Sequence, residues 1–354
     1  MELGRNLEAR TPIELPVEVK PSLMVVVDTE EEFDWQRRNF DRNATGVSAM
    51  AELWRAQEIC EEFGLAPTYV IDYPIATSPD AVAVLRDFSQ RGKAQIGAHL
   101  HAWVNPPFDE QLTRANSYQG NLDPALEHRK LTCLLEAIET SFDERPTTHK
   151  AGRYGFGKHT AETLLDLGID IDFSAACGYD FTADQGPNFS RLDAHLYRLG
   201  KNGQLLGIPT TGGFTGPLHD FGSKVYSQHN LQSMSGGLLA SVLSKSRILE
   251  RILLSPEGHT LDKMKRLTRA LVQRGVRVFT ISFHSPTVKP GCTPYTNTAR
   301  DVANFLDKMR RYFEFFTGRL GGIPTTPQAV KELVRQQGSA KNSHFFVSAL
   351  ASKN

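Results

Sequence analysis

The sequence reads LMVVVD over residues 23–28, an apolar run that stops abruptly at Asp28. Its three consecutive valines favour an extended backbone, because β-branched side chains pack well on a pleated sheet. A short and continuous apolar run is typical of a strand that is buried on both faces, as in a parallel sheet. We therefore predict a buried parallel strand that ends at a carboxylate.

The same pattern of apolar strand and amphipathic helix continues along the chain. The further predicted strands cover residues 67–71, 94–99, 169–173 and 276–283. The predicted helices cover residues 48–63, 80–91, 126–142, 159–167, 261–274 and 301–317, and several of them end at a glycine. Such alternation predicts an α/β fold in which helices cover a parallel sheet.

One long stretch breaks this alternation, at about residues 175–260. It is rich in Gly, Ser and Pro, and we predict within it a hairpin of 195–199 with 204–208 and a helix around 238–254. A βα loop usually has about 2–6 residues, so this stretch is too long to be one. We expect an inserted cap region over one face of the fold.

The whole chain of 354 residues is consistent with one large domain. We expect a poorly ordered lead-in at residues 1–20, where prolines interrupt regular helix, then a single domain at 21–337 and a flexible tail at 338–354.

Charge and composition narrow the classes of partner. Lys plus Arg and Asp plus Glu both number 40, so no net positive field favours nucleic acid. No segment approaches the ~20 apolar residues of a membrane-spanning helix, and we expect neither membrane insertion nor a signal peptide. The four scattered cysteines are typical of reduced thiols, so we expect a cytoplasmic protein. The oligomeric state is left open.

Polar side chains follow four of the predicted strands. Asp28 follows the first, His99 and His101 a second, Asp172 a third and His284 a fourth. The carboxyl ends of parallel strands meet at one face, where active sites form. These side chains are therefore predicted to form one cluster.

The acid-rich sequence DTEEE at residues 28–32 needs a neutralising partner. Four acids in five positions repel one another unless a cation or base lies nearby. The alternative is a solvated helix N-terminus, where acids complement the helix dipole. For Asp28 itself, which lies at the strand end, a site role is favoured.

The sequence HLH at residues 99–101 predicts a metal site. In an extended chain His99 and His101 point the same way, so both imidazoles can reach one ion. Two imidazoles with a carboxylate are the ligands of a hydrolytic metal site. A lone histidine would more often be a satisfied core residue.

Three weaker signals remain. In KAGRYG at 150–155, the glycines allow close backbone approach, and Arg153 could hold a carboxylate, although a turn with a surface arginine is the alternative. His284 ends an apolar strand and could protonate a leaving group, or it could be a packing residue. Gly213 could line the pocket, but turn geometry explains it equally well.

Taken together, the motifs resemble the polysaccharide deacetylases with NodB homology (carbohydrate esterase family 4), particularly their WalW-like branch. The similar segments are VVVDTEEEFDW at 25–35, IGAHLHAWVNPPF at 96–108, KAGRYGFG at 150–157, DIDFS at 170–174, IPTTGGFTG at 208–216, the long segment at 254–286, which ends in ISFHSP, and LGGIPTTP at 320–327. They span nearly all of residues 21–330.

The resemblance implies a deformed (β/α)7-type barrel that uses a divalent metal, usually zinc, to remove N-acetyl groups from amino sugars. Asp28 matches the family's catalytic base. The usual metal aspartate falls at Thr29, so Glu30 is our substitute. His99 matches the first metal histidine. The usual second one falls at Trp103, so His101 takes that role.

The remaining roles follow the same motifs. Arg153 is expected to steady Asp28, and the backbone near Tyr154 to hold an oxyanion. His284 matches the family's catalytic acid, with Asp172 to orient it. We assign Tyr154, Trp103 and Gly213 to substrate contact.

Two alternatives stay open. One is a glycosidase-type hydrolase with two carboxylates among Asp28, Glu30 and Asp172. The other is a non-catalytic sugar-binding relative. The expected substrate is an amino sugar or a small glycoconjugate precursor, because a cytoplasmic protein does not meet extracellular polymers.

Overall fold

The computed structural model describes residues 10–34 and 40–337 and contains a curled mixed sheet. Its strand order is β1-β7-β8-β6-β5-β4-β3-β2-β11, and β12 also pairs with β2. The bounds are β1 Thr11–Ile13, β2 Ser22–Thr29, β3 Thr68–Ile71, β4 Gln95–Leu100, β5 Thr148–Ala151, β6 Ile171–Asp172, β7 Leu196–Leu199, β8 Leu205–Gly207, β11 Val278–His284 and β12 Ile323–Pro324.

The strands from β8 to β11 in this order are all parallel, whereas at one edge β7 pairs antiparallel with both β8 and β1. A few backbone hydrogen bonds join β11, at one end of the parallel part, to the segments that follow β8 and β10, and they partly close the sheet into a barrel. The N–H of Thr211 donates to the carbonyl of Thr280 (3.3 Å), and the N–H of Ser282 donates to the carbonyl of Leu254 (3.2 Å). The sheet is thus a deformed, incompletely closed barrel, as the fold class predicted from the sequence.

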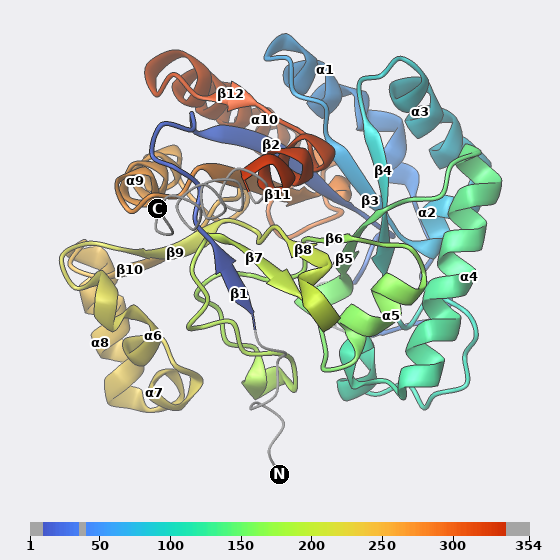
Figure 1. The fold of residues 1–354 in the computed structure, drawn as a ribbon, viewed down its shortest axis with the longest axis horizontal. Helices are drawn as coiled ribbons and strands as arrows, with labels where there is room; N and C mark the ends of the chain where they lie inside the picture. Colours follow the sequence, from blue (N-terminus) through green and yellow to red (C-terminus); the bar gives the residue numbers. More distant parts are fainter. Residues whose placement is uncertain (1–9, 35–39, 338–354) are drawn as a thin grey trace, which may run out of the picture.

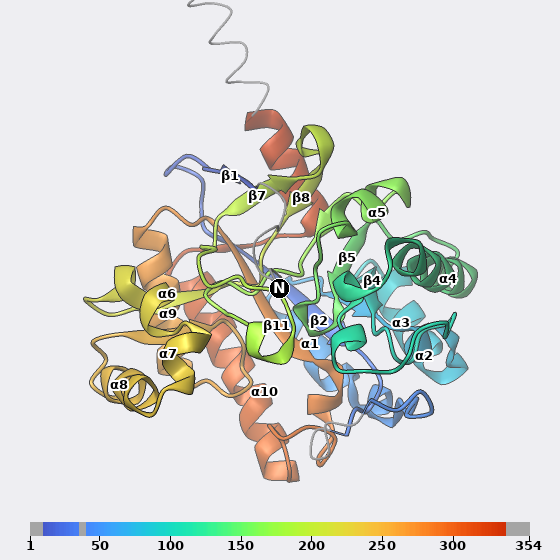
Figure 2. The same cartoon turned by 90° about the horizontal axis from the view of Figure 1, so that it is seen from below.

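Helices surround this sheet (Figures 1 and 2). Their bounds are α1 Trp54–Glu62, α2 Tyr73–Thr77, α3 Pro79–Gln90, α4 Pro124–Phe142, α5 Thr160–Asp166, α9 Leu261–Gln273 and α10 Ala299–Glu314. The N-cap side chains of α3, α4, α9 and α10 (Ser78, Asp123, Thr260 and Thr298) accept hydrogen bonds from the first turn. Among the described residues, no helix combines the length and the apolar character needed to cross a bilayer.

The stretch at about 175–260 differs in part from the secondary structure that the sequence predicts. Its hairpin is formed by β7 and β8, which join the main sheet. The helix expected around 238–254 is instead α8, Met234–Lys245, followed by β10, Glu250–Leu253. This strand pairs antiparallel with β9, Gly212–Thr215. Its residue Ile252 is buried, as is Leu254 directly after it. Helices α6 (Gly222–Val225), α7 (Gln228–Gln232) and α8 stand outside the ring of helices (Figure 2).

The ends of the chain bear on the expected domain limits. Residues 11–13 form β1 and pair with β7, so the expectation of poor order is wrong there. Residues 1–9 and the expected tail 338–354 lie outside the described residues.

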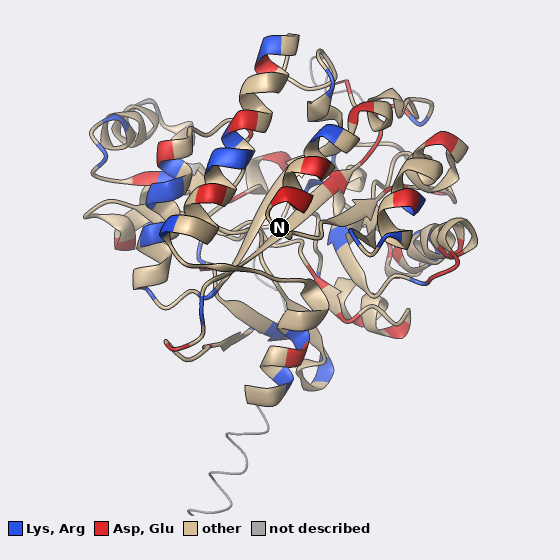
Figure 3. Ribbon diagram, turned by 90° about the horizontal axis from the view of Figure 1, so that it is seen from above, with Lys and Arg blue, Asp and Glu red and all other residues tan. Residues whose placement is uncertain are grey.

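Charged residues of both signs are interspersed along the outer helices (Figure 3).

The pleat of β2 decides which side chains face the barrel interior. Leu23, Val25 and Val27 pack into the layer between sheet and helices, whereas Met24 and Val26 belong to a separate apolar cluster inside the barrel. Successive side chains of a strand point to opposite faces, so the even-numbered residues of β2 point inward. Asp28 and, beyond the strand, Glu30 continue this inward series.

The core on the outer side of the sheet should carry much of the stability. Phe279 is fully buried in β11 and lies 5.5 Å, centroid to centroid, from the ring of Phe316. We expect Phe279→Ala to lower the free energy of unfolding by about 3–5 kcal/mol, measured by urea denaturation. The control Phe221→Ala, at a 57% exposed phenylalanine, should change it by about 0.5 kcal/mol. Equal losses in both variants would contradict this packing.

Candidate metal centre and cavity

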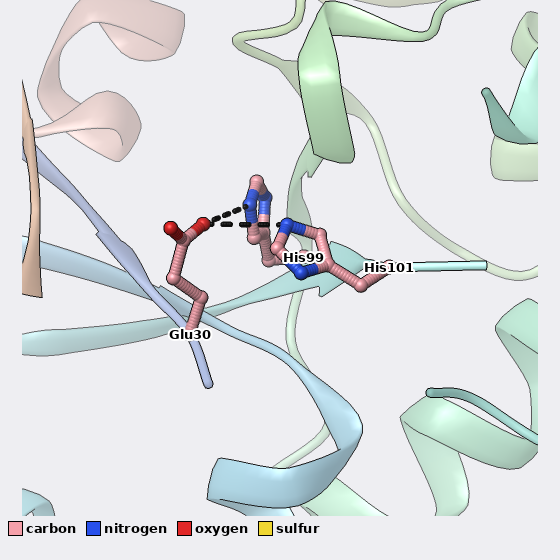
Figure 4. A group of neighbouring side chains, drawn as sticks. All are labelled: Glu30, His99 and His101. Carbon is pink, nitrogen blue, oxygen red and sulfur yellow. Dashed lines mark ion pairs between the residues drawn. The ribbon is translucent and has the colours of Figure 1, made fainter. Parts of the chain in front are cut away.

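Glu30, His99 and His101 meet at the C-terminal ends of β2 and β4. The Nε2 atoms of His99 and His101 lie 3.4 and 3.3 Å from the same Glu30 oxygen. Their candidate ligand atoms all lie within 4.8 Å of one another, and all three residues are buried. Figure 4 shows both imidazoles turned toward the Glu30 carboxylate. The three residues that the sequence analysis assigns to the metal, Glu30, His99 and His101, therefore lie together.

The outer nitrogens of both rings are already engaged. His99 Nδ1 lies 2.8 Å from the carbonyl of Lys150, and His101 Nδ1 lies 2.7 Å from Glu31. Such partners fix the ring orientation and leave Nε2 free to bind an ion, as is usual for metal-binding histidines. The donor set of two imidazoles and one carboxylate fits a divalent metal, and it is the set found in catalytic zinc sites.

Burial and neighbouring charges shift the pKa values of all three residues of the cluster. Burial favours the protonated form of Glu30, but His284 and the two imidazoles outweigh it and hold its pKa well below the usual range. Burial lowers the pKa of His99. For His101, Glu31 outweighs the burial effect and raises the pKa well above 6.5.

Glu31 holds the second layer of the site together. It accepts from Nε1 of Trp103 (2.8 Å), and the ring of Trp103 stacks on His101 with centroids 4.2 Å apart. The N–H of Glu31 donates to Asp72 (2.8 Å). Burial, together with Glu31, raises the pKa of Asp72 well above its normal value.

Asp28 lies beside this cluster and is held by Lys150. The Lys150 ammonium donates to both Asp28 oxygens, at 2.6 and 2.7 Å, and to Ser282 at 2.8 Å. Arg153 instead binds Ser117 and Asp184. The expectation that Arg153 steadies Asp28 is thus wrong. Lys150 reaches Asp28 because it is the interior neighbour of His99 on β5.

His284 occupies the expected place but has a different partner. Its Nε2 lies 3.9 Å from Asp28, and its Nδ1 lies 2.8 Å from Glu257. Burial lowers the pKa of His284, but Glu257 and Glu30 outweigh that effect and raise it to about 10. Glu257 also accepts from the N–H of His284 (3.0 Å).

Asp172 was expected to orient His284, and that prediction is wrong. Its carboxylate lies 2.8 Å from Nδ1 of His149 and accepts from Ser174. Ile171 and Phe173 face the barrel interior, so the pleat turns Asp172 to the opposite face, toward the helices. The sequence places Asp172 at a strand end but does not show which face it occupies.

A cavity of about 490 Å³ opens beside Glu30, His101 and His284. Tyr154 and Trp103 line it as expected, and Arg153 lines it too. Gly213 does not appear among its described lining residues. Its backbone is in β9 with φ of 151°, and a Cβ there would face Leu271 of α9, so its expected substrate contact stays a prediction.

The turn after β5 shapes the wall next to the metal cluster. A Cβ on Gly152 would lie 2.4 Å from Cδ2 of His101, so only glycine fits there. Arg153 and Tyr154 follow with φ of 55° and 59°. Two successive side chains in the left-handed region cost about 1–3 kcal/mol each, and such strain clusters at functional sites.

Three residues of the site have no assigned role in the sequence analysis: Lys150, Glu257 and Glu31. Strand parity is a signal for Lys150, which faces the interior beside His99. Glu31 belongs to the acid cluster, but its role depends on Trp103. Glu257 lies in the loop between β10 and α9, where no periodicity indicates its direction.

No family model and no curated protein matches the chain. Among solved structures, a Mycobacterium smegmatis protein assigned as a polysaccharide deacetylase superposes with a TM-score of 0.53 at 18% identity, covering 94% of this chain and 96% of that one. PuuE allantoinase superposes with a TM-score of 0.53 at 14% identity, covering 92% and 93%. At these identities the likeness shows a shared fold, the deformed barrel of the NodB type.

The metal centre predicts a specific loss on mutation. After incubation with zinc, we expect His99→Ala to hold far less of the ion than the wild type, because two remaining ligands hold an ion poorly. Metal content of the purified protein, by mass spectrometry, measures this. His128→Ala, at an exposed histidine of α4, should keep the wild-type content. Full zinc occupancy in His99→Ala would contradict the assignment.

Proposed function

We propose that this protein is a metal-dependent hydrolase that removes an N-acetyl group from an amino sugar or a glycoconjugate precursor. One arrangement carries the proposal: the Glu30–His99–His101 cluster, the Asp28–Lys150 pair and the His284–Glu257 pair adjoin each other at one cavity. Together they supply a metal site, a candidate base and a candidate acid. The motifs of the WalW-like deacetylases support the same chemistry.

Glu30, His99 and His101 would hold the ion, for which their donor set favours zinc. When bound, a divalent cation supplies Lewis acidity, which polarises a carbonyl group and makes water a stronger acid. Glu31 and the Lys150 carbonyl keep the two imidazoles in the orientation that binding needs.

Asp28 is the proposed base. Lys150 holds both of its oxygens, so the carboxylate is fixed in position at the end of β2. It can take a proton from water that attacks the acetyl carbonyl. The strained turn at Tyr154 adjoins His101 through Gly152, and its backbone is the proposed site for the developing oxyanion.

His284 is the proposed acid. Glu257 fixes its Nδ1, so Nε2 is the atom that can give a proton to the departing amine. With a raised pKa it stays protonated at neutral pH, which suits this role. Asp172 lies on the other face of the sheet, which removes one of the carboxylates that a glycosidase mechanism would use.

The decisive experiment measures free acetate from N-acetylglucosamine and its derivatives. We expect the zinc-loaded protein to release acetate, the chelated protein to fall to background, and added zinc to restore the rate, because the reaction needs Lewis acidity. Cleavage that persists after complete metal removal would favour the glycosidase alternative. If the zinc-loaded protein released no acetate from any N-acetylated sugar, the non-catalytic alternative would stand.

The pH profile tests the acid. Because the folded pKa of His284 is raised, activity should be present below that pKa and lost as the pH rises through it. Glu257 is the largest influence that raises it, so Glu257→Gln should move the alkaline limb of kcat toward neutral pH and lower kcat about 10²-fold. An unmoved alkaline limb in Glu257→Gln would contradict the pairing.

We further propose a cytoplasmic location.

A further inference from the structure

Away from the metal cluster, the cavity wall is mostly aromatic. The rings of Tyr154 and Phe181 stack with centroids 5.3 Å apart, and those of Phe40 and Trp103 lie 5.0 Å apart. The phenylalanine, tryptophan and tyrosine residues that line the cavity are Phe33, Phe40, Trp103, Tyr118, Tyr154, Tyr179, Phe181, Phe283 and Tyr295. Such a wall binds flat or weakly polar faces of a ligand and excludes water.

Two arginines interrupt this aromatic wall and share a single carboxylate. Arg114 donates to one oxygen of Asp184 (2.7 Å), and Arg153 donates to the other. The guanidinium of Arg153 also lies over the ring of Tyr118, 4.0 Å from its centroid. Since Asp184 carries one charge and the arginines carry two, one positive charge remains after pairing.

The other charged groups at the cavity do not offset that charge. Glu257 is paired with His284, and Glu30 faces the metal site. Asp28 is paired with Lys150. With a divalent ion at Glu30, the described cavity wall is net positive, and a neutral sugar would leave that charge without a partner.

The backbone places these cations close to the reaction centre. Arg153 follows Gly152, where an added Cβ would lie 2.4 Å from Cδ2 of His101, so the arginine is next to a backbone position that packs closely on His101. The next residue, Tyr154, also has a left-handed backbone conformation and lines the same cavity. A group bound by Arg153 can thus belong to the same small molecule as the amide that is cut.

We propose that the substrate carries a phosphate group, which the Arg114–Arg153 pair binds while the acetamide faces the metal centre. This inference rests on the proposed function. Guanidinium groups bind phosphate oxygens through paired, charge-assisted hydrogen bonds. The chemistry fits both an N-acetylhexosamine phosphate and a nucleoside-diphosphate-linked N-acetylhexosamine, whose base the aromatic rings could stack on.

A purely structural role is the competing explanation. The two arginines also tie the segment around Ser117 to the turn around Asp184. In that case their removal would loosen the cavity wall and weaken every ligand equally. The test must therefore compare charged and neutral ligands in the same variants.

Binding separates this inference from catalysis. Titration calorimetry on the full chain, metal-loaded and, in parallel, metal-free so that phosphate bound to the ion is recognised, would use N-acetylglucosamine, its 1-phosphate, its 6-phosphate and the uridine diphosphate conjugate. We expect at least one phosphorylated compound to bind about tenfold or more tightly than N-acetylglucosamine. Which one does so identifies the source of the phosphate.

The arginine variants complete the test. Arg114→Gln and Arg153→Gln should each reduce the preference for the phosphorylated compound about tenfold, whereas the surface variant Arg145→Gln should keep it. Equal affinity for charged and neutral compounds in the wild type, or a preference that survives in both arginine variants, would overturn the inference. Acetate release by the zinc-loaded protein is measured separately, so failure of the hydrolase proposal leaves this result interpretable.

Discussion

Three carboxylates, Asp28, Glu30 and Glu31, are buried where β2 ends, and each needs its own compensation. Lys150 neutralises Asp28, the two imidazoles face Glu30, and Glu31 binds both His101 and Trp103. An unpaired buried charge costs several kcal/mol, so these contacts cannot be exchanged freely. The rest of the site is arranged around this need.

The need to pair buried charges also explains the positions of Lys150 and Glu257. Lys150 contacts Asp28 through its side chain and His99 through its carbonyl, so one residue of β5 links Asp28 to the Glu30–His99–His101 cluster. Glu257, from the loop after β10, does the same for His284 through its carboxylate. The stretch at about 175–260 therefore contributes a residue to the site, from the loop after β10.

Much of this could be predicted from the local pattern. Apolar runs that end in polar residues gave the strands, and the i, i+2 spacing of His99 and His101 placed two imidazoles on one face. The same periodicity accounts for Glu30: Thr29 falls on the outward face of β2, so a ligand must come from the next inward position. The predicted role of Asp172 was wrong because its strand, β6, has only two residues and shows no periodicity that would tell which face Asp172 occupies.

The chain's own periodicity therefore fixed the strands, the direction of the metal ligands and the end of the barrel at which they gather, because these depend on neighbours two to four residues apart. The partners of Asp28 and His284 lie 122 and 27 residues away, and no local pattern encodes such pairs. Folding decided them, since only the curled sheet and the loop after β10 bring Lys150 and Glu257 to buried charges that must be paired.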